Sequence, residues 1–289
     1  MNIQSEVIGN NTVSYLDFRP KCQSSKTLIL CLHGFPDSPQ SFESLATSFG
    51  KQGFRVICPY LKGYGPSAGH NDKDFYVDSV ARDLKSLVTK LGFDRVILVG
   101  HDWGSAVVSA YSIQYAETVE KMILIGFPPF NSLIPSPIQF LKSWYFLFLS
   151  VPKLPVWSFG LKDGALFEIF LRLWSPKWDY QQVFTDTKAA LKPVAARKAA
   201  LSYYRNLFLI HKKRFHECYR LMRKPITVPT LAVAGGKDRA VDIGHFFRLK
   251  KGIKAPYSFE HFEDQGHFPH LEDPERFRRL AVEFVNWSH

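Results

Sequence analysis

The sequence predicts an α/β fold in which a mostly parallel sheet, flanked by helices, is interrupted by an inserted helical cap. The 289 residues are 46% hydrophobic and 22% charged, which suits one large folded core. Toward both ends of the chain, apolar runs of strand length alternate with segments of helical periodicity. Between them lies a stretch rich in Pro and aromatic residues that has no convincing strand. We therefore expect a core at 1–126, a cap at 127–225 and a second core segment at 226–289.

The first core segment opens with two short strand patterns separated by the turn signal Gly-Asn-Asn. Continuous apolar runs follow, as expected for strands that are buried on both faces of a parallel sheet. Apolar residues recur at helical spacing before and after the third of these runs. The expected strands are 3–8, 12–18, 27–32, 54–59, 96–99 and 121–126, and the expected helices are 74–91 and 104–116.

The cap and the last core segment differ sharply in pattern. Helical stretches are expected in the cap near 137–150, 163–174 and 184–209. The last segment returns to alternation, with strands at 229–236 and 257–262 and a helix at 274–287.

Composition favours an ordinary intracellular protein. The net charge is +11, but the basic residues are dispersed and no nucleic-acid motif is recognised, so we expect no nucleic-acid partner. No signal peptide is apparent, and the most apolar segment, 144–151, is much shorter than the roughly 20 residues of a transmembrane helix. We expect a cytoplasmic monomer or homodimer without stable membrane insertion. Cys31 and Cys58 lie in strand-like runs, which predicts buried free thiols.

Residues 96–108, V-I-L-V-G-H-D-W-G-S-A-V-V, place Asp102 at the centre of a Gly-x-Asp-x-Gly frame. With serine at the centre, this frame is a nucleophile elbow, in which small flanking residues let a strand turn sharply into a helix. A lone match has a simpler interpretation, an Asp that caps the following helix. Three further segments favour a catalytic role.

Two of these segments supply an acid and a base. G-G-K-D (235–238) places Asp238 just after a late strand, and Q-G-H-F (265–268) places His267 in the loop after the last strand. Taken singly, Asp238 could be a turn residue and His267 a structural histidine. The chain order Asp102, Asp238, His267 is, however, the nucleophile, acid, base order of this type of elbow.

The third segment is H-G-F-P (33–36), which directly follows a buried strand. In the same architecture this position gives a backbone N–H to an oxyanion hole, here from Phe35. The second N–H would come from Trp103, the residue after the nucleophile.

Together these segments resemble the α/β-hydrolase superfamily over essentially the full chain and, within it, the epoxide hydrolases. H-G-F-P-D-S, G-H-D-W-G and L-S-Y-Y-R-N match the family patterns, while K-G-Y-G-P-S has Lys62 where Arg is usual. The resemblance implies that two cap tyrosines hold the epoxide oxygen, Tyr145 in S-W-Y-F-L-F and Tyr204 in Y-Y-R-N. Tyr203 is the alternative to Tyr204, and packing within the cap is the simpler interpretation of either tyrosine.

Chemistry separately favours aspartate attack on a saturated carbon. Attack on an ester or amide would give an unfavourable anhydride, whereas displacement at an sp³ carbon gives a stable alkyl ester. With an ordinary pKa of about 4, an Asp is ionised at neutral pH and needs no base for this step. His267, oriented by Asp238, would then activate water against the ester. An epoxide also leaves a basic alkoxide, for which a tyrosine can donate the proton.

The expected substrate is a small apolar epoxide, because the cap is rich in aromatic residues. No metal or cofactor is expected. The cap aromatics are Phe146, Phe148, Trp157, Phe159 and Phe167, and the candidate substrate-binding residues are His33, Pro36, Trp103, Phe148 and Trp157.

Two alternatives remain open. A haloalkane dehalogenase would use the same Asp nucleophile and bind halide through the Trp103 indole, with a second indole from Trp157, Trp174 or Trp178. A non-catalytic receptor would hold an apolar ligand beneath the cap.

Overall fold

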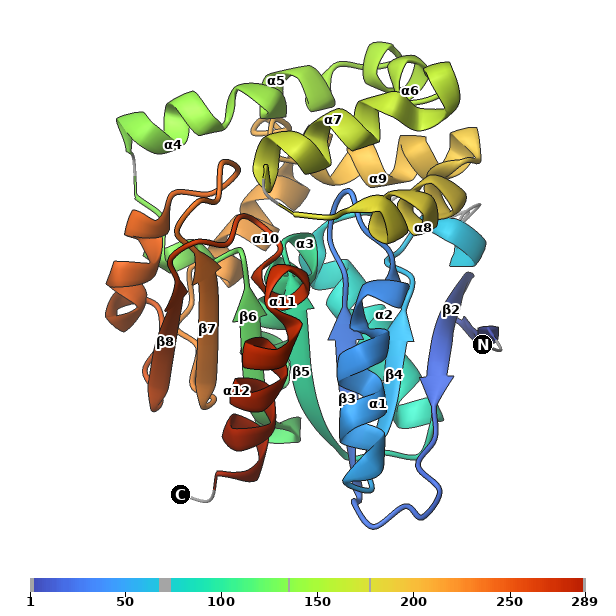
Figure 1. Ribbon diagram of the computed structural model, residues 1–289, viewed down its shortest axis with the longest axis vertical. Coiled ribbons are helices and arrows are strands. Elements are labelled where there is room, and N and C mark those ends of the chain that lie inside the picture. The colour runs from blue at the N-terminus through green and yellow to red at the C-terminus, as the bar shows by residue number, and fades with distance from the viewer. Residues whose placement is uncertain (1–2, 68–73, 135, 177, 288–289) are drawn as a thin grey trace.

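The computed structural model describes residues 3–67, 74–134, 136–176 and 178–287 (Figure 1). Eight strands of the described chain form one sheet in the order β1-β2-β4-β3-β5-β6-β7-β8. The pairs β1–β2 and β2–β4 are antiparallel, and all later neighbours are parallel. The strands are β1 (Ile3–Ile8), β2 (Asn11–Phe18), β3 (Thr27–Leu32), β4 (Arg55–Pro59), β5 (Arg95–His101), β6 (Val119–Ile125), β7 (Thr230–Gly235) and β8 (Tyr257–Phe262). The predicted mostly parallel sheet is confirmed.

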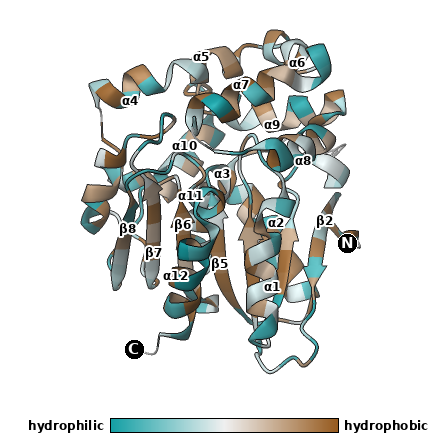
Figure 2. Cartoon of the chain, in the orientation of Figure 1, coloured by the Kyte–Doolittle hydropathy of each residue, from teal (hydrophilic) through white to brown (hydrophobic). Residues whose placement is uncertain are grey.

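Helices cover both faces of this sheet, which explains why the central strands are apolar throughout. Alternate side chains of β3 enter two different cores: Leu28 and Leu30 join one, and Ile29 and Cys31 join the other. The helices α1 (Glu43–Lys51) and α12 (Pro274–Asn286) pack in the second core, whereas α2 (Val77–Lys90) and α3 (Trp103–Gln114) pack in the first. Figure 2 shows the central strands β5 and β6 as predominantly hydrophobic, with hydrophilic residues along α1 and α12.

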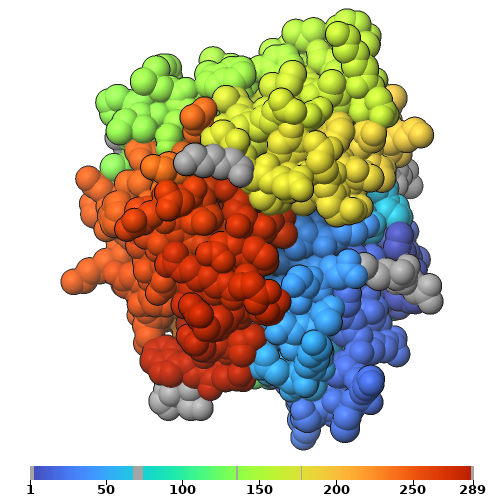
Figure 3. All heavy atoms as spheres, in the orientation of Figure 1, coloured from blue at the N-terminus to red at the C-terminus, as the bar shows by residue number. Residues whose placement is uncertain are grey.

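A layer of helices lies across one end of the sheet, over the carboxyl ends of the parallel strands (Figure 1). In the space-filling view it covers both halves of the core (Figure 3). Its helices are α4 (Pro137–Lys142), α5 (Trp144–Ser150), α6 (Leu154–Ser158), α7 (Ala165–Trp174), α8 (Gln181–Leu191) and α9 (Val194–Asn206). The first core, unlike the second, continues into this layer.

Two cap helices expected to be continuous are interrupted. The expected 137–150 helix breaks at Ser143, which ends α4 and begins α5. The expected 184–209 helix breaks at Pro193, whose extended backbone (ψ 136°) and missing N–H end one helix before the next begins. The residue bounds of the cap stay a prediction. Within them, α10 (Lys213–Met222) packs against α2 and α3.

Short connecting elements complete the chain between the helices and strands. They are η1 (Pro39–Phe42), η2 (Gly65–Ser67), η3 (Ala116–Thr118), η4 (Phe130–Ser132), η5 (Leu161–Gly164), η6 (Ile243–Lys251) and the short helix α11 (Pro269–Glu272). Among the residues that the structure describes, no helix has the length and apolar character needed to cross a bilayer. Cys31 and Cys58 are buried free thiols, as predicted.

Candidate active site

Asp102 lies at a sharp turn between β5 and α3. Its backbone has φ 51° and ψ −117°, a conformation that residues other than glycine rarely adopt. The turn requires close backbone approach: a Cβ on Gly104 would lie 2.1 Å from the Leu32 carbonyl oxygen, and one on Gly100 would lie 2.5 Å from the Gly104 carbonyl oxygen. Asp102 is therefore held as a nucleophile elbow holds its central residue, and its side chain does not cap α3.

His267 and Asp238 meet Asp102 in the order that the sequence suggests. Nδ1 of His267 lies 2.8 Å from Oδ2 of Asp238, and Nε2 lies 3.5 Å from Oδ2 of Asp102. All three residues are buried, and Asp102 is the most exposed of them at 9%. The imidazole thus lies between two carboxylates contributed by distant parts of the chain.

This position changes the protonation of His267. Burial lowers the pKa of its imidazole, but the charge of Asp238, the hydrogen bonds to Asp102 and Asp238 and the charge of Asp102 together raise it to about 10. In the free protein at neutral pH the side chain is therefore an imidazolium. Two of these four favourable interactions come from Asp102, so loss of the Asp102 charge would lower the pKa of His267.

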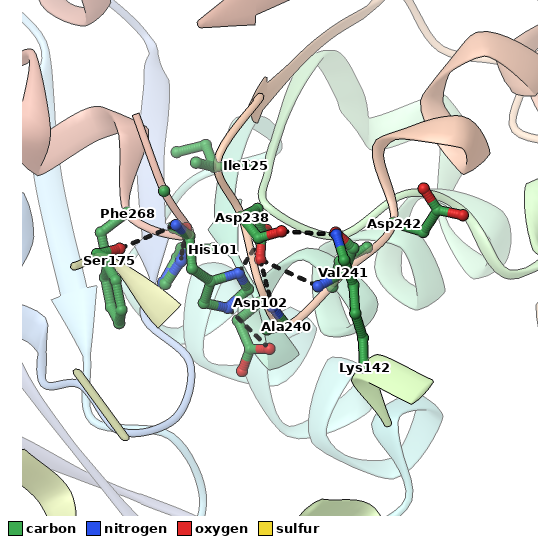
Figure 4. Close-up of polar contacts among 12 residues, drawn as sticks. His101, Asp102, Ile125, Lys142, Ser175, Asp238, Ala240, Val241, Asp242 and Phe268 are labelled. Carbon is green, nitrogen blue, oxygen red and sulfur yellow. Dashed lines mark hydrogen bonds and ion pairs between the residues drawn. The ribbon is translucent and has the colours of Figure 1, made fainter. Parts of the chain in front are cut away.

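Backbone donors hold Asp238 in place. Its Oδ1 accepts hydrogen bonds from the N–H groups of Ala240 (2.6 Å) and Val241 (3.0 Å), which leaves Oδ2 for His267. Lys142 on α4 reaches down from the cap and donates to the carbonyl oxygens of Asp238 (2.6 Å) and Val241 (3.0 Å). Figure 4 shows these contacts converging on the loop after β7.

The loop that carries His267 is fixed by residues that sequence reasoning did not identify. The His267 N–H donates to Oγ of Ser175, a cap residue, and that hydroxyl donates to Oε1 of Glu272. Glu272 also accepts hydrogen bonds from the N–H groups of Gly266 (2.7 Å) and Phe268 (3.0 Å). Glu272 lies five residues after the histidine, a local spacing that could have signalled the contact. Ser175 is far away in the sequence and had no such signal.

His101, directly before Asp102, supports the same loop. Its Nε2 lies 3.0 Å from the His267 carbonyl oxygen and must donate, because a carbonyl only accepts. Its other nitrogen faces Asp37 at 3.6 Å, and His270 packs beside it. Asp37, His101 and His270 offer ligand-type atoms within 4.8 Å of one another. Since His101 is bonded to the His267 backbone, we interpret this buried group as support for the catalytic loop.

The expected oxyanion-hole donors both lie beside Asp102. The Phe35 N–H donates to Oδ1 of Asp102 at 2.9 Å. Trp103 directly follows Asp102 as the first residue of α3. An oxyanion that formed on the carboxyl carbon of Asp102 would thus develop next to the N-terminus of a helix, where backbone dipoles favour negative charge.

Above Asp102 lies an apolar cavity of about 170 Å³. Tyr145 of α5 and Tyr204 of α9 both line it, together with Asp102 and Trp103, whereas Tyr203 does not. Burial, followed by the charge of Asp102, raises the pKa of both Tyr145 and Tyr204 well above 10, so both phenols stay protonated. The remaining walls are formed by Ala106, Phe127, Phe130, Leu133, Gln139, Ser143, Phe146, Leu207 and Val241.

Only one of the five candidate substrate-binding residues, Trp103, belongs to the described lining of this cavity. Trp103 lines the cavity, but Trp157 is 62% exposed on α6 and does not, so its expected substrate-binding role is wrong. Phe148 is half-buried against the core, and Phe146, two residues earlier on α5, lines the cavity in its place. Of the other expected cap aromatics, Phe159 and Phe167 stack on each other beside Phe35.

His33 and Pro36 belong to the loop after β3 and do not line the described cavity. Burial lowers the pKa of His33 to about 4, so its imidazole is neutral. Its Nδ1 donates to the Gly34 carbonyl, and Nε2 accepts from the Leu61 N–H at 3.0 Å. The Pro36 carbonyl accepts a hydrogen bond from Thr187 of the cap. Their positions correct the expectation that they contact substrate.

Comparisons with known proteins agree with this architecture. A family model described as the alpha/beta hydrolase fold matches residues 27–274, and the chain therefore belongs to the α/β-hydrolase family. The AB hydrolase superfamily protein YfhM of Bacillus subtilis is 31% identical over 273 residues, covering 89% of this chain and 90% of the relative.

Epoxide hydrolases are also among the relatives. Epoxide hydrolase 4 of Homo sapiens is 28% identical over 274 residues, covering 91% of this chain and 73% of the relative. The crystal structure of a single-residue variant of an epoxide hydrolase from Bacillus megaterium superposes with a TM-score of 0.82 at 20% identity, covering 98% of this chain and 100% of that one. The resemblance expected from the sequence motifs is thereby confirmed, and the superposition supports the fold.

Proposed function

We propose that this α/β hydrolase converts an apolar epoxide to a vicinal diol through a covalent ester on Asp102. The observation that carries the proposal is the meeting of one carboxylate and two protonated phenols, Tyr145 and Tyr204, in a single apolar cavity. A carboxylate can attack the epoxide carbon, and the phenols can hold and protonate the oxygen that leaves it.

In the first step, an Asp102 oxygen bonds to an epoxide carbon as the carbon–oxygen bond of the ring breaks. The alkoxide takes a proton from Tyr145 or Tyr204, because a phenol is much more acidic than the alcohol that forms. The ester has no charge, so the pKa of His267 falls from about 10. The proton of His267 then restores the tyrosine and leaves a neutral imidazole.

In the second step, His267 removes a proton from water, and the hydroxide adds to the ester carbonyl of Asp102. The N–H groups of Phe35 and Trp103 stabilise the resulting oxyanion. Its collapse releases the diol, and the departing alkoxide takes the proton of the newly formed carboxylic acid. Asp102 is again a carboxylate and His267 an imidazolium, which is the starting state.

The proposal is tested by incubating the protein separately with styrene oxide and 1-bromobutane, and measuring diol and bromide. Diol without bromide is expected. In a single turnover in ¹⁸O-water, the label should enter the Asp102 carboxylate, and label appearing directly in the diol would mean direct hydration. The His267→Gln variant should accumulate an adduct equal in mass to the epoxide, and Asp102→Ala should form none.

Bromide release without diol would instead favour haloalkane dehalogenation, and neither product would favour a ligand receptor. Dehalogenation is less well supported because Trp103 is the one indole in the described cavity wall. Trp157 is exposed, and Trp178 stacks on Phe268. Trp174 packs against Tyr145 and His267 without lining the cavity.

A further inference from the structure

The outer side of the cap carries a concentration of exposed apolar side chains. The helices α4, α5 and α6 run along the top of the molecule in Figure 1 and Figure 3, with the sheet far below them. Nine of the nineteen large hydrophobic residues that are exposed in the described chain fall within residues 138–161. An apolar patch of this kind marks a surface that contacts another molecule or a membrane. We call this set the outer cap face, and its members are Ile138, Phe140, Leu141, Trp144, Leu147, Val151, Leu154, Trp157 and Leu161.

The helices that carry the outer cap face are apolar on both sides. On α5, Tyr145 and Leu149 are buried, and Tyr145 lines the catalytic cavity. Trp144 and Leu147 of the same helix are exposed, and α6 shows the same division between buried and exposed apolar residues. A helix on the surface of a globular protein normally presents polar residues to water. The second apolar side is therefore available for an apolar partner.

The charges along this part of the chain have one sign. Between residues 122 and 162 there are three lysines and no Asp or Glu. Lys142 is bonded to the loop of Asp238. Lys153 and Lys162, which lie before and after α6, are exposed and form no ion pair with a described residue. Exposed tryptophan and leucine side chains beside unpaired lysines are typical of surfaces that rest on anionic lipid headgroups.

A second copy of the chain fits the outer cap face less well than a lipid surface does. In a symmetric dimer the same surface of each protomer meets, so Lys153 and Lys162 of one copy would approach those of the other. The next acidic residue along the chain, Asp163, is already paired with Lys188. Lysines buried without a counter-charge are unfavourable, whereas lipid phosphates would supply one. The charges therefore favour an anionic lipid surface.

We propose that the outer cap face rests on the surface of a lipid bilayer that contains anionic lipids. The helices have only five to seven residues, so they lie in the plane of the headgroups and do not cross the bilayer. Their exposed tryptophan, phenylalanine and leucine side chains reach the boundary of the acyl chains, and Lys153 and Lys162 contact lipid phosphates. The inner sides of α4 and α5 line the catalytic cavity, so docking leaves one layer of helices between this cavity and the bilayer. The inference concerns where the protein lies and does not depend on the proposed reaction.

Cosedimentation with vesicles of phosphatidylcholine, with and without phosphatidylglycerol, tests the proposal. The unmodified protein should bind both kinds of vesicle, and should bind more tightly when phosphatidylglycerol is present. Replacing Phe140, Leu147 and Trp157 together by Ser should weaken binding at least about tenfold, because three large apolar side chains no longer leave water. All three are at least 62% exposed and none lines the catalytic cavity, so the circular dichroism spectrum should be unchanged.

The matched control changes equally exposed apolar residues outside the outer cap face. Val7, Ile210 and Phe247 are 64–67% exposed, and their joint replacement by Ser should leave vesicle binding unchanged. Equal losses of binding in the two triple variants would overturn the proposal. So would a failure of the unmodified protein to bind either kind of vesicle.

A pair of lysine variants tests the charge contribution. Lys153→Gln with Lys162→Gln should weaken binding to vesicles that contain phosphatidylglycerol about tenfold or more at low ionic strength, and should leave binding to phosphatidylcholine alone unchanged. Lys21→Gln with Lys26→Gln is the matched control, because it removes the same net charge from the loop before β3, at the opposite end of the sheet from the cap. Equal effects of the two pairs would mean that the net charge of +11 attracts the protein to lipid, which would contradict the proposal.

Tryptophan fluorescence reports which face meets the bilayer. Lipids brominated along their acyl chains quench a tryptophan that lies beside them, and Trp144→Phe with Trp157→Phe should remove most of this quenching. Unchanged quenching in that variant would place another face on the bilayer and overturn the proposal. Dimerisation in solution that the triple variant of Phe140, Leu147 and Trp157 abolishes, with no binding to vesicles, would also overturn it and identify a second copy as the partner.

Discussion

Tyr203 and Tyr204 are adjacent on α9, yet their hydroxyls meet different surroundings. The Tyr203 hydroxyl donates to the Lys62 carbonyl at 3.2 Å, and Tyr203 does not line the cavity above Asp102. Tyr204 lines the catalytic cavity with Tyr145. Consecutive side chains on a helix point about 100° apart, so one of the pair had to turn away from Asp102. Only the packing of α9 on the core decides which one.

Replacing both Tyr145 and Tyr204 by Phe should suppress epoxide opening at least about 100-fold, because no phenol then remains in the cavity to hold and protonate the alkoxide. Tyr203→Phe is the matched control and should change kcat less than about threefold, since its hydroxyl is bonded to Lys62. Single-turnover formation of the Asp102 ester is the measurement. Ester formation at the normal rate in the double variant would contradict the proton-donor assignment.

At the scale of elements, the elbow depends on how closely β5, α3 and β3 approach. A single glycine, Gly104, lets the first turn of α3 rest against the carbonyl oxygen of Leu32 at the end of β3. That contact sets the direction in which Asp102 leaves the strand. The glycines of the Gly-x-Asp-x-Gly pattern are therefore required by close contacts between backbone segments.

Gly104→Ala should destabilise the protein by about 3 kcal/mol or more, because its Cβ would overlap a backbone atom that cannot rotate away. Gly50→Ala is the matched control. It lies within α1, and its Cβ would meet nothing within 4 Å, so stability should rise by about 0.4–1 kcal/mol. Urea unfolding of both variants measures the difference. Equal stabilities would show that the elbow tolerates a wider approach.

Elements of the core were more predictable than those of the cap. A strand buried on both faces is apolar throughout, so β3 was visible directly in T-L-I-L-C-L. In the cap, helices are short and are ended by local features such as Ser143 and Pro193, which a periodicity of apolar residues does not reveal. The exposed Trp157 shows the same limit, because an aromatic residue in a helical segment carries no sign of which way it faces.

At the scale of the whole molecule, the cap holds the catalytic loops as well as covering them. Lys142 bonds the loop of Asp238, and Ser175 bonds the loop of His267. The two loops come from the second core segment, after the cap in the chain. Any shift of the cap would therefore displace both Asp238 and His267.

The raised pKa of His267 links the site to the stability of the whole fold. Its folded-state value is about 10, above the ordinary value of 6.5, so the protonated form stabilises the fold. This contribution is fully present below pH 6.5 and is lost as the pH rises through about 10. It should be on the order of a few kcal/mol at its maximum.

The expected result is that the difference in unfolding free energy between the unmodified protein and His267→Gln falls as the pH rises from 6.5 to about 10. Denaturant unfolding at several pH values measures it, and taking the difference cancels the titration of other groups. A difference that grew with pH would mean that His267 is neutral in the folded protein.

The sequence by itself determined the sheet and marked the elbow and the chain order of Asp102, Asp238 and His267, because apolar runs and short motifs are visible without knowing which distant residues meet. Tertiary structure decided which tyrosine faces Asp102, which cap aromatics line the cavity, and which residues hold His267 in place. These outcomes depend on how the cap rests on the core and on contacts between distant core segments, such as that of His101 with His267, which are 166 residues apart. A side chain's direction at such a contact is set by packing, which no local pattern encodes.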